Sequence, residues 1–152
     1  MSATPMMTMS PADLKATATR LVEEVINKGN LDRFTDYFTA DYVEHVPPPT
    51  PDFPKGLEGF KAIFGSLRAA FPDFHYTVED TLVDGDMVVQ RVMGHGTMKG
   101  AFLGMPPTGK HADWSEIHIS RMGANGKFVE HWANQDQASM LTQLGLMTPP
   151  GS

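Results

Sequence analysis

The sequence predicts a single α+β domain, in which a cone-shaped, curved antiparallel sheet is covered by three N-terminal helices and a short C-terminal helix. Before residue 72, apolar residues recur at steps of three and four, and after residue 74 they alternate with polar ones. Helices followed by a run of strands are typical of the α+β class, and 152 residues fit one domain. We expect this domain to cover residues 10–145, between a disordered tail at 1–9 and a second tail at 146–152.

Capping residues and apolar spacing indicate the helices. Ser10 and Pro11 suit a helix N-terminus, and the apolar residues from Leu14 to Ile26 form one stripe behind them. The remaining expected helices are 31–38, 57–71 and 135–144.

Alternation with a period of two indicates the strands. Asp84-Gly85-Asp86 predicts a hairpin turn, and the glycine-punctuated stretch 94–109 predicts a loop. The expected strands are 74–82, 87–93, 114–122 and 127–134. A sheet of this kind, bent into a cone under its helices, leaves a cavity, so function depends on which polar side chains point inward.

Composition excludes several classes of site. The chain has no cysteine, which excludes disulfides, thiolate nucleophiles, zinc ribbons and iron–sulfur clusters. The net charge of -6 disfavours nucleic acid as a partner, and no run of about 18 apolar residues predicts a membrane span. No glycine-rich phosphate loop follows a strand. Because no basic and apolar leader precedes the first helix, we expect a cytoplasmic protein.

The six histidines form no HxH or HExxH motif, so no metal site is expected. A metal centre would have to be assembled from separate strands, for instance by His45, His118 and His131. Scattered histidines more often serve as surface groups or as satisfied core groups.

One face of the expected strand 114–122 is unusually polar. Alternation places these residues on that face: Trp114, Glu116, His118 and Ser120. Two interpretations stay open. Either the face meets solvent, or it lines a cavity that contains a general base.

The neighbouring expected strand also carries His131, Trp132 and Asn134. Trp132 suits a core position as well as a pocket wall. Asp136, just after this strand, is either an acid near the site or the N-cap of the last helix.

Two further places offer polar groups. Just before a proline-rich loop lie Tyr42, Glu44 and His45, which suits a pocket rim or an ordinary exposed connection. Arg91 lies in a strand rich in Val and Met, so it is either exposed at an edge or an inward charge that needs a partner. The acids considered for that partner are Glu116 and Asp136.

Four short segments stand out, namely 104–108 (GMPPT), 117–121 (IHISR), 126–131 (GKFVEH) and 143–145 (QLG). In this order they resemble the SnoaL-like polyketide cyclases and the broader ester cyclase group. The resemblance implies the cone-shaped α+β fold of nuclear transport factor 2-like proteins, with a homodimer or homotetramer and no metal or organic cofactor.

In cyclases of this family, an aspartate acts as acid and base in an intramolecular aldol condensation, and a histidine on the neighbouring strand helps to line the site. The resemblance places the histidine at His118 and the aspartate at Ala133, which cannot move a proton. Either Asp136 or Glu116 takes over proton transfer beside His118, or the pocket serves different chemistry or none.

We therefore expect a cofactor-independent acid/base enzyme that acts on a small apolar carbonyl compound, with polyketide cyclisation as the leading example. The alternatives are a non-catalytic protein that binds a hydrophobic ligand, and a hydrolase that activates water in the same pocket. The expected catalytic residues are His118, Asp136 and Glu116. The expected substrate-binding residues are Tyr42, His45, Arg91, Trp114, His131, Trp132 and Asn134.

Overall fold

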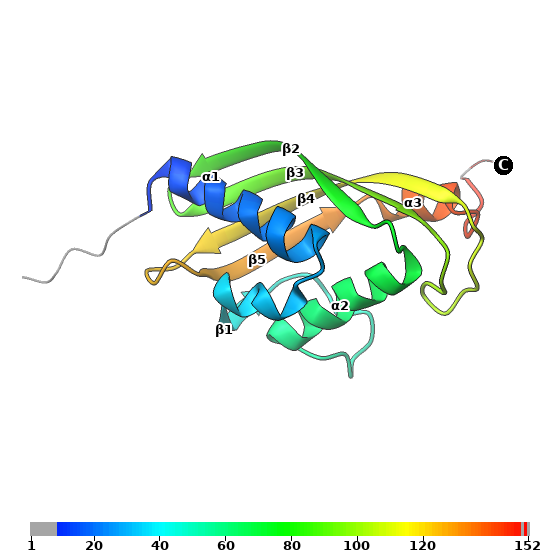
Figure 1. The fold of residues 1–152 in the computed structure, drawn as a ribbon, viewed down its shortest axis with the longest axis horizontal. Helices are drawn as coiled ribbons and strands as arrows, with labels where there is room; N and C mark the ends of the chain where they lie inside the picture. Colours follow the sequence, from blue (N-terminus) through cyan, green and yellow to red (C-terminus); the bar gives the residue numbers. More distant parts are fainter. Residues whose placement is uncertain (1–8, 150, 152) are drawn as a thin grey trace, which may run out of the picture.

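One curved sheet of five strands and a layer of helices make up the fold (Figure 1). In chain order the elements are α1 (Pro11–Arg20), η1 (Leu21–Asn27), η2 (Leu31–Asp36), β1 (Phe38–Glu44), α2 (Gly56–Ala70), β2 (His75–Asp84), β3 (Met87–Thr97), β4 (His111–Met122), β5 (Phe128–Gln135) and α3 (Gln137–Gln143). This computed structural model describes residues 9–149 and 151, so most of the tail expected at 1–9 lies outside the described residues.

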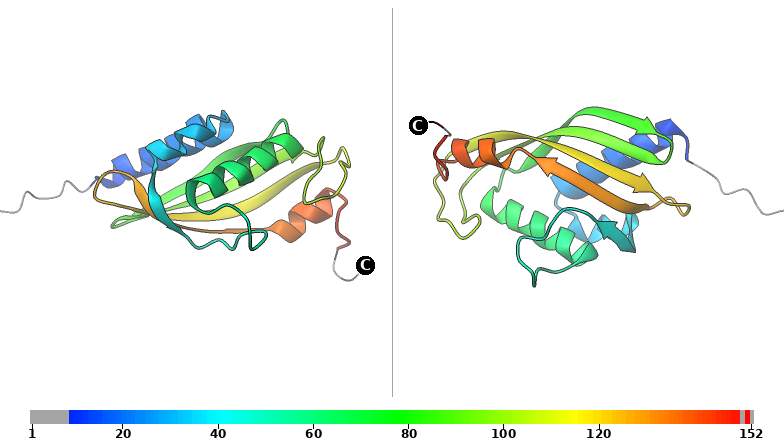
Figure 2. Two further views of the ribbon diagram at one scale, coloured as in Figure 1. Left: turned by 90° about the horizontal axis from the view of Figure 1, so that it is seen from below. Right: turned by 180° about the vertical axis from the view of Figure 1, so that it is seen from behind.

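The strands follow the order β1-β5-β4-β3-β2, which leaves β1 and β2 at the two edges. The α+β class is confirmed, and the sheet stays open instead of closing into a barrel. The helices α1, η1 and α2 lie against one face, which we call the inner face (Figure 2). No helix of the described part lies across the opposite, outer face. Among the described residues, no helix is long and apolar enough to span a membrane.

The first helix begins as predicted and changes type part-way. Ser10 Oγ accepts a hydrogen bond from the backbone N–H of Asp13 at 3.1 Å, which caps α1. After Arg20 the helix continues as the π-helical segment η1, a rare and wider form. The apolar stripe predicted from Leu14 to Ile26 is confirmed as a core-facing surface, because its apolar residues are buried in both parts.

Strand β3 runs to Thr97 instead of ending before Gly94, so the predicted loop starts late. Glycine makes this possible, because large rings pack directly on the backbone of β3. A Cβ added at Gly94 would collide with the indole of Trp114, and one at Gly96 would lie 2.8 Å from Cβ of Phe71.

Strand β1 is not among the strands expected from the sequence, and it runs parallel to β5 in a sheet that was predicted to be antiparallel. The backbone N–H of Phe128 donates to the Tyr37 carbonyl at 2.7 Å, and that of His45 donates to the His131 carbonyl at 3.0 Å. Alternation in one strand carries no information on the direction of its partner. The parallel pairing places Glu44 beside His131.

Gly94→Ala should lower the free energy of unfolding by about 1–3 kcal/mol, the usual cost of overpacking, because its Cβ would meet the Trp114 ring. Gly65 lies within α2, and an added Cβ there has nothing within 4 Å. Gly65→Ala should therefore raise the free energy of unfolding by up to about 1 kcal/mol. Urea unfolding measures the change in the free energy of unfolding for each variant. A Gly94→Ala variant as stable as the wild type would contradict this account of β3.

Candidate active site

The polar face of β4 points toward the helices. Trp114, Glu116 and Ser120 are buried, with no more than 8% of each residue exposed, and the side chain of His118 is 21% exposed. The interpretation that this face meets solvent is therefore wrong, and the face points inward; that it carries a general base stays a prediction.

Four ionisable side chains on the inner face form one hydrogen-bonded line, which we call the carboxylate–histidine row. Its members in order are Glu44 from β1, His131 from β5, and His118 and Glu116 from β4. A carboxylate oxygen of Glu44 lies 2.8 Å from Nδ1 of His131. Nε2 of His131 lies 3.0 Å from Nδ1 of His118. Nε2 of His118 lies 2.8 Å from Oε1 of Glu116.

These contacts require a definite number of protons. An ionised carboxylate only accepts hydrogen bonds, so Nδ1 of His131 and Nε2 of His118 each carry a proton when Glu44 and Glu116 are ionised. The contact between the two rings needs one proton more, because two bare lone pairs would repel. Three protons on two imidazoles give the pair one positive charge, and the whole row then has one net negative charge.

Glu116 is held as a carboxylate by its donors. Burial is the largest single effect on the pKa of Glu116, and by itself it raises that pKa. The hydrogen bond and the charge of His118, together with hydrogen bonds from Trp114 and Tyr76, outweigh it, so the pKa of Glu116 lies below its ordinary value. The indole N–H of Trp114 donates to Oε2 at 2.6 Å, and the hydroxyl of Tyr76 donates to Oε1 at 2.9 Å. Burial raises the pKa of Tyr76 well above its ordinary value, so this hydroxyl keeps its proton.

His131 is the neutral member of the ring pair. Burial lowers the pKa of His131, because its charged form loses hydration, and the hydrogen bond with Glu44 opposes this effect without cancelling it. A neutral His131 places the shared proton on Nδ1 of His118 and leaves Nε2 of His131 as the acceptor.

The space beside the row is small. This inner cavity has a volume of about 40 Å³, which holds a few water molecules. Its polar lining consists of Tyr76, Gln90, His118, Ser120 and His131. Its aromatic lining consists of Phe34, Phe38, Phe60 and Phe64. These rings pack against one another, as in the stacked pair Phe34 and Phe60 at 5.0 Å, so the larger hollow expected from the sequence is closed.

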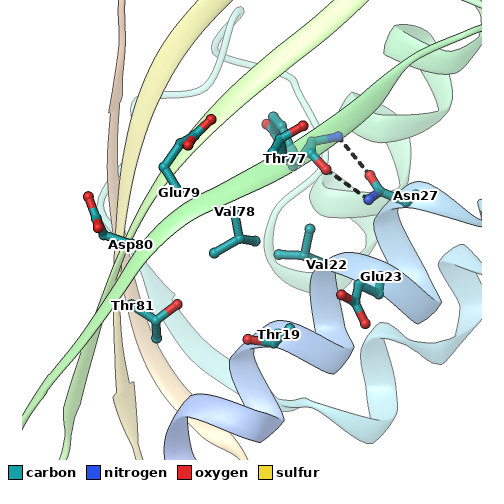
Figure 3. Close-up of a pocket in the computed structure, with 10 residues that line it drawn as sticks. Thr19, Val22, Glu23, Asn27, Thr77, Val78, Glu79, Asp80 and Thr81 are labelled. Carbon is teal, nitrogen blue, oxygen red and sulfur yellow. Dashed lines mark hydrogen bonds between the residues drawn. The ribbon is translucent and has the colours of Figure 1, made fainter.

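A larger space lies between the first helix and the edge strand β2 (Figure 3). This outer cleft has a volume of about 480 Å³ and is lined by Thr19, Val22, Glu23, Asn27 and residues 76–81. The side-chain amide of Asn27 accepts from the backbone N–H of Tyr76 at 2.7 Å and donates to its carbonyl at 2.9 Å. Asn27 thereby attaches η1 to β2.

Comparison with known proteins identifies the family. The model of the SnoaL-like polyketide cyclase family matches residues 16–144. The chain belongs to this family. Nogalonic acid methyl ester cyclase of Streptomyces nogalater is 28% identical to it over 123 residues, which are 78% of this chain and 88% of that protein.

Solved structures agree with this assignment. IdmH of Streptomyces antibioticus, described as a candidate polyketide cyclase, is 33% identical with a TM-score of 0.75, and the match covers 87% of this chain and 98% of that one. TsrD of Streptomyces laurentii has a TM-score of 0.80 at 24% identity, with coverage of 92% and 100%. That second likeness supports the fold alone.

In this SnoaL-like polyketide cyclase family member, Ala133 pairs with His118 across β5 and β4. The position to which the resemblance assigns an aspartate therefore lies next to the histidine, but the carboxylates of the site come from elsewhere. Glu116 lies on the same strand as His118, and Glu44 lies at the end of β1. Glu44 was expected at a pocket rim but not among the catalytic or substrate-binding residues, because its contact with His131 spans 87 positions along the chain.

Three other expected residues touch the row or belong to it. His131 is one of its members, Trp114 donates to Glu116, and the hydroxyl of Tyr42 lies 3.2 Å from Oε2 of Glu44. Among residues 9–149 and 151, no group of three or more histidine and carboxylate side chains is arranged to hold a metal ion.

Some expected site residues lie on the outer face instead. Alternation along β5 turns Trp132 and Asn134 away from the side on which His131 lies. Trp132 stacks on His45, with ring centroids 4.6 Å apart, and Nε2 of His45 lies 2.7 Å from Glu130. Asn134 is exposed. None of these side chains lines the inner cavity.

Arg91 and Asp136 also have partners of their own. Arg91 pairs with Asp80 on β2 at 2.7 Å, so the expectation that Glu116 or Asp136 pairs with it is wrong. Arg91 lies at an exposed position of β3 and needs no inward partner. The carboxylate of Asp136 accepts from the backbone N–H of Ser139 at 3.1 Å and caps α3, which is the second of the two interpretations left open.

Stability should fall as the pH is lowered through the histidine range. His131 takes up a proton near pH 6.5 in the unfolded chain but only at lower pH in the folded one, so acid favours unfolding. The loss should begin near pH 6.5 and continue down to the lowered pKa of the folded protein. In urea unfolding, His131→Gln should flatten this pH dependence, whereas substitution of the exposed His75 by Gln should retain it. Identical pH profiles for the two variants would contradict the assignment.

Proposed function

We propose that this protein is a cofactor-independent acid/base enzyme that closes a ring in a polyketide-like substrate by intramolecular aldol condensation. Family membership supports ring closure, and the relative from Streptomyces nogalater is named for an ester substrate. The observation that carries the proposal is the carboxylate–histidine row, which brings an acceptor nitrogen and a donor N–H together at the inner cavity.

The two imidazoles divide the proton transfers. Nε2 of His131 removes a proton from the carbon beside a carbonyl group, and the electron pair passes into an enolate. The enolate carbon attacks a second carbonyl of the same molecule, and the new C–C bond leaves an alkoxide. Nδ1 of His118 gives its proton to that oxygen. The proton on His131 then returns to His118 across their 3.0 Å contact.

The two carboxylates determine which nitrogens are available. Glu44 binds Nδ1 of His131, and Glu116 binds Nε2 of His118, so the two nitrogens that remain face each other. When His131 takes the proton, the row becomes neutral while the enolate carries the negative charge. The reaction therefore moves one buried charge and does not create a second one, which limits its cost in the interior.

A substrate of this class requires the inner cavity to widen. Sites for small molecules usually have volumes of about 300–1,000 Å³, whereas the inner cavity has about 40 Å³. The proposal therefore includes displacement of the aromatic rings above the row when the substrate binds.

Turnover of nogalonic acid methyl ester, followed by chromatographic separation of the cyclised isomer, tests the proposal. His118→Ala should lower kcat by at least about a hundredfold, the usual contribution of a general acid or base. Glu44→Gln should lower kcat roughly tenfold, because the amide keeps the ring in place without its charge. Glu130→Gln is the matched control, since Glu130 pairs with a histidine on the outer side of the same two strands. Full activity of His118→Ala would remove the row from the mechanism.

A non-catalytic binder of an apolar ligand is the second candidate. Ala133 beside His118 and the aromatic lining of the inner cavity favour it. Retention of the ester without turnover in the same assay would support binding over catalysis. A hydrolase that holds water between His118 and Asp136 has less support, because the Asp136 carboxylate caps α3.

We also infer that two copies of the chain associate through the outer face. The strand register places four apolar residues in one line across this face, Leu82, Val89, Ile119 and Trp132. Leu82 is 63% exposed, and the nearby Ile117 on the central strand β4 is 48% exposed. Apolar surface of this kind on a sheet face is typical of an interface between proteins.

Leu82→Glu should convert a dimer into a monomer, because it places a charge at the β2 end of the apolar line, on its most exposed residue. Leu103→Glu is the control, since Leu103 is 52% exposed but lies in the loop after β3. Sedimentation velocity distinguishes the two results. A wild-type protein that sediments as a monomer at high concentration would contradict the proposed association.

A further inference from the structure

We propose that the outer cleft is a substrate-binding site, which receives the substrate before it reaches the carboxylate–histidine row and selects neutral, hydroxylated ring compounds over carboxylates. This inference rests on the proposed function, since it gives a route and a compound class for the same reaction. It assigns a role to a space of about 480 Å³ between the first helix and β2.

The outer cleft and the inner cavity share a wall. Val22 and Tyr76 line both spaces. Gln90 in the inner cavity donates to the hydroxyl of Thr81 in the outer cleft at 3.3 Å. On its inner side, Tyr76 donates to Glu116, the end of the row. A ligand in the outer cleft is therefore separated from the row by the side chains of Val22 and Tyr76.

The helical side of this wall is η1, which is fixed at one end. Asn27 pairs with the backbone of Tyr76 (Figure 3). Arg68 from α2 donates to the carbonyls of Ile26 and Asn27 at 3.2 and 3.0 Å. Among the described residues, no side chain of α1 forms a hydrogen bond with β2. The polar attachments thus gather at Asn27, whereas Val22 lies on the unattached part of a π-helical segment, a form that is frequent at functional sites.

The lining of the outer cleft indicates the class of ligand. Val22 and Val78 lie on opposite walls and offer apolar contact (Figure 3). Glu23 carries a carboxylate that has no hydrogen-bond or ion-pair partner among the described residues. A carboxylate only accepts hydrogen bonds, so a ligand with hydroxyl donors on a flat apolar skeleton fits this lining.

The carboxylate of Glu23 also disfavours an anionic ligand. A free acid would bring a second negative charge to the outer cleft of a protein whose net charge is already -6. An ester of that acid carries no such charge. The outer cleft therefore admits the esterified substrate of the proposed function and rejects its free acid.

A cysteine-free chain allows the outer cleft to be blocked at one chosen thiol. Glu23→Cys in the cleft, or Lys15→Cys on the exposed side of α1, is coupled to a polyethylene glycol maleimide in a Trp132→Phe background. Trp114 is then the only indole, and its N–H resonance reports ligand arrival at the row through its bond to Glu116. Added 2-naphthol should shift this resonance. The polymer at position 23 should weaken the apparent affinity at least roughly tenfold, and the polymer at position 15 should leave it unchanged.

A comparison of two probe molecules tests the preference for neutral ligands. The probe 2-naphthoate has a carboxylate in place of the hydroxyl of 2-naphthol, so it brings a charge and lacks the donor, and it should bind roughly tenfold more weakly. The variant Glu23→Gln should remove most of this difference. An equal affinity for the two probes in the wild-type protein would overturn the selectivity for neutral compounds.

Two results would overturn the route itself. One is a 2-naphthol titration that the polymer at position 23 leaves unchanged, and the other is no shift of the Trp114 resonance in the unblocked protein. Failure of the proposed function has a different signature: the ester is not turned over, while the 2-naphthol shift and its block at position 23 persist.

Discussion

Two imidazoles and two carboxylates lie beneath a layer of aromatic rings because they bond to one another. Each of these groups alone would lose several kcal/mol on leaving water, and breaking a buried ion pair costs about 3–5 kcal/mol. The carboxylates at the two ends of the row also accept hydrogen bonds from donors outside the row. The backbone N–H of Val46 donates to Glu44 at 3.0 Å, and the indole of Trp114 donates to Glu116 at 2.6 Å. Every strand that contributes to the row must therefore keep its register.

This requirement explains several features of the sheet. Glu116 and His118 share a face because they are two positions apart on β4. His131 pairs with Ser120, which places it diagonally next to His118. The parallel pairing of β1 with β5 brings Glu44 to the far end of the row. The aromatic rings that exclude water from the row also close the inner cavity, so the layer that keeps the groups bonded is the layer that a substrate has to displace.

Local patterns were sufficient for the α+β class and for placing Glu116 and His118 on one face of β4, because side chains alternate along a strand. They left open whether that face meets solvent or the interior. They were insufficient where the answer depends on a distant partner. Nothing near Glu44 in the sequence reveals that β1 lies parallel to β5, and nothing near Arg91 reveals that its partner is Asp80. Likewise, the glycines of β3 resemble a loop until the packing of Trp114 on Gly94 is known.

The positions of the two carboxylates decide what chemistry the interior supports. An aspartate at position 133 would face His118 directly and compete for its proton. With Ala133 there, the carboxylates flank the ring pair instead of facing it, and the proton that can move lies between two nitrogens at the inner cavity. When both ends of the row are ionised, the contact between the two rings requires the extra proton. Protonating either carboxylate therefore weakens the contact between the rings, so the basicity of the site and the stability of the interior depend on the same charges.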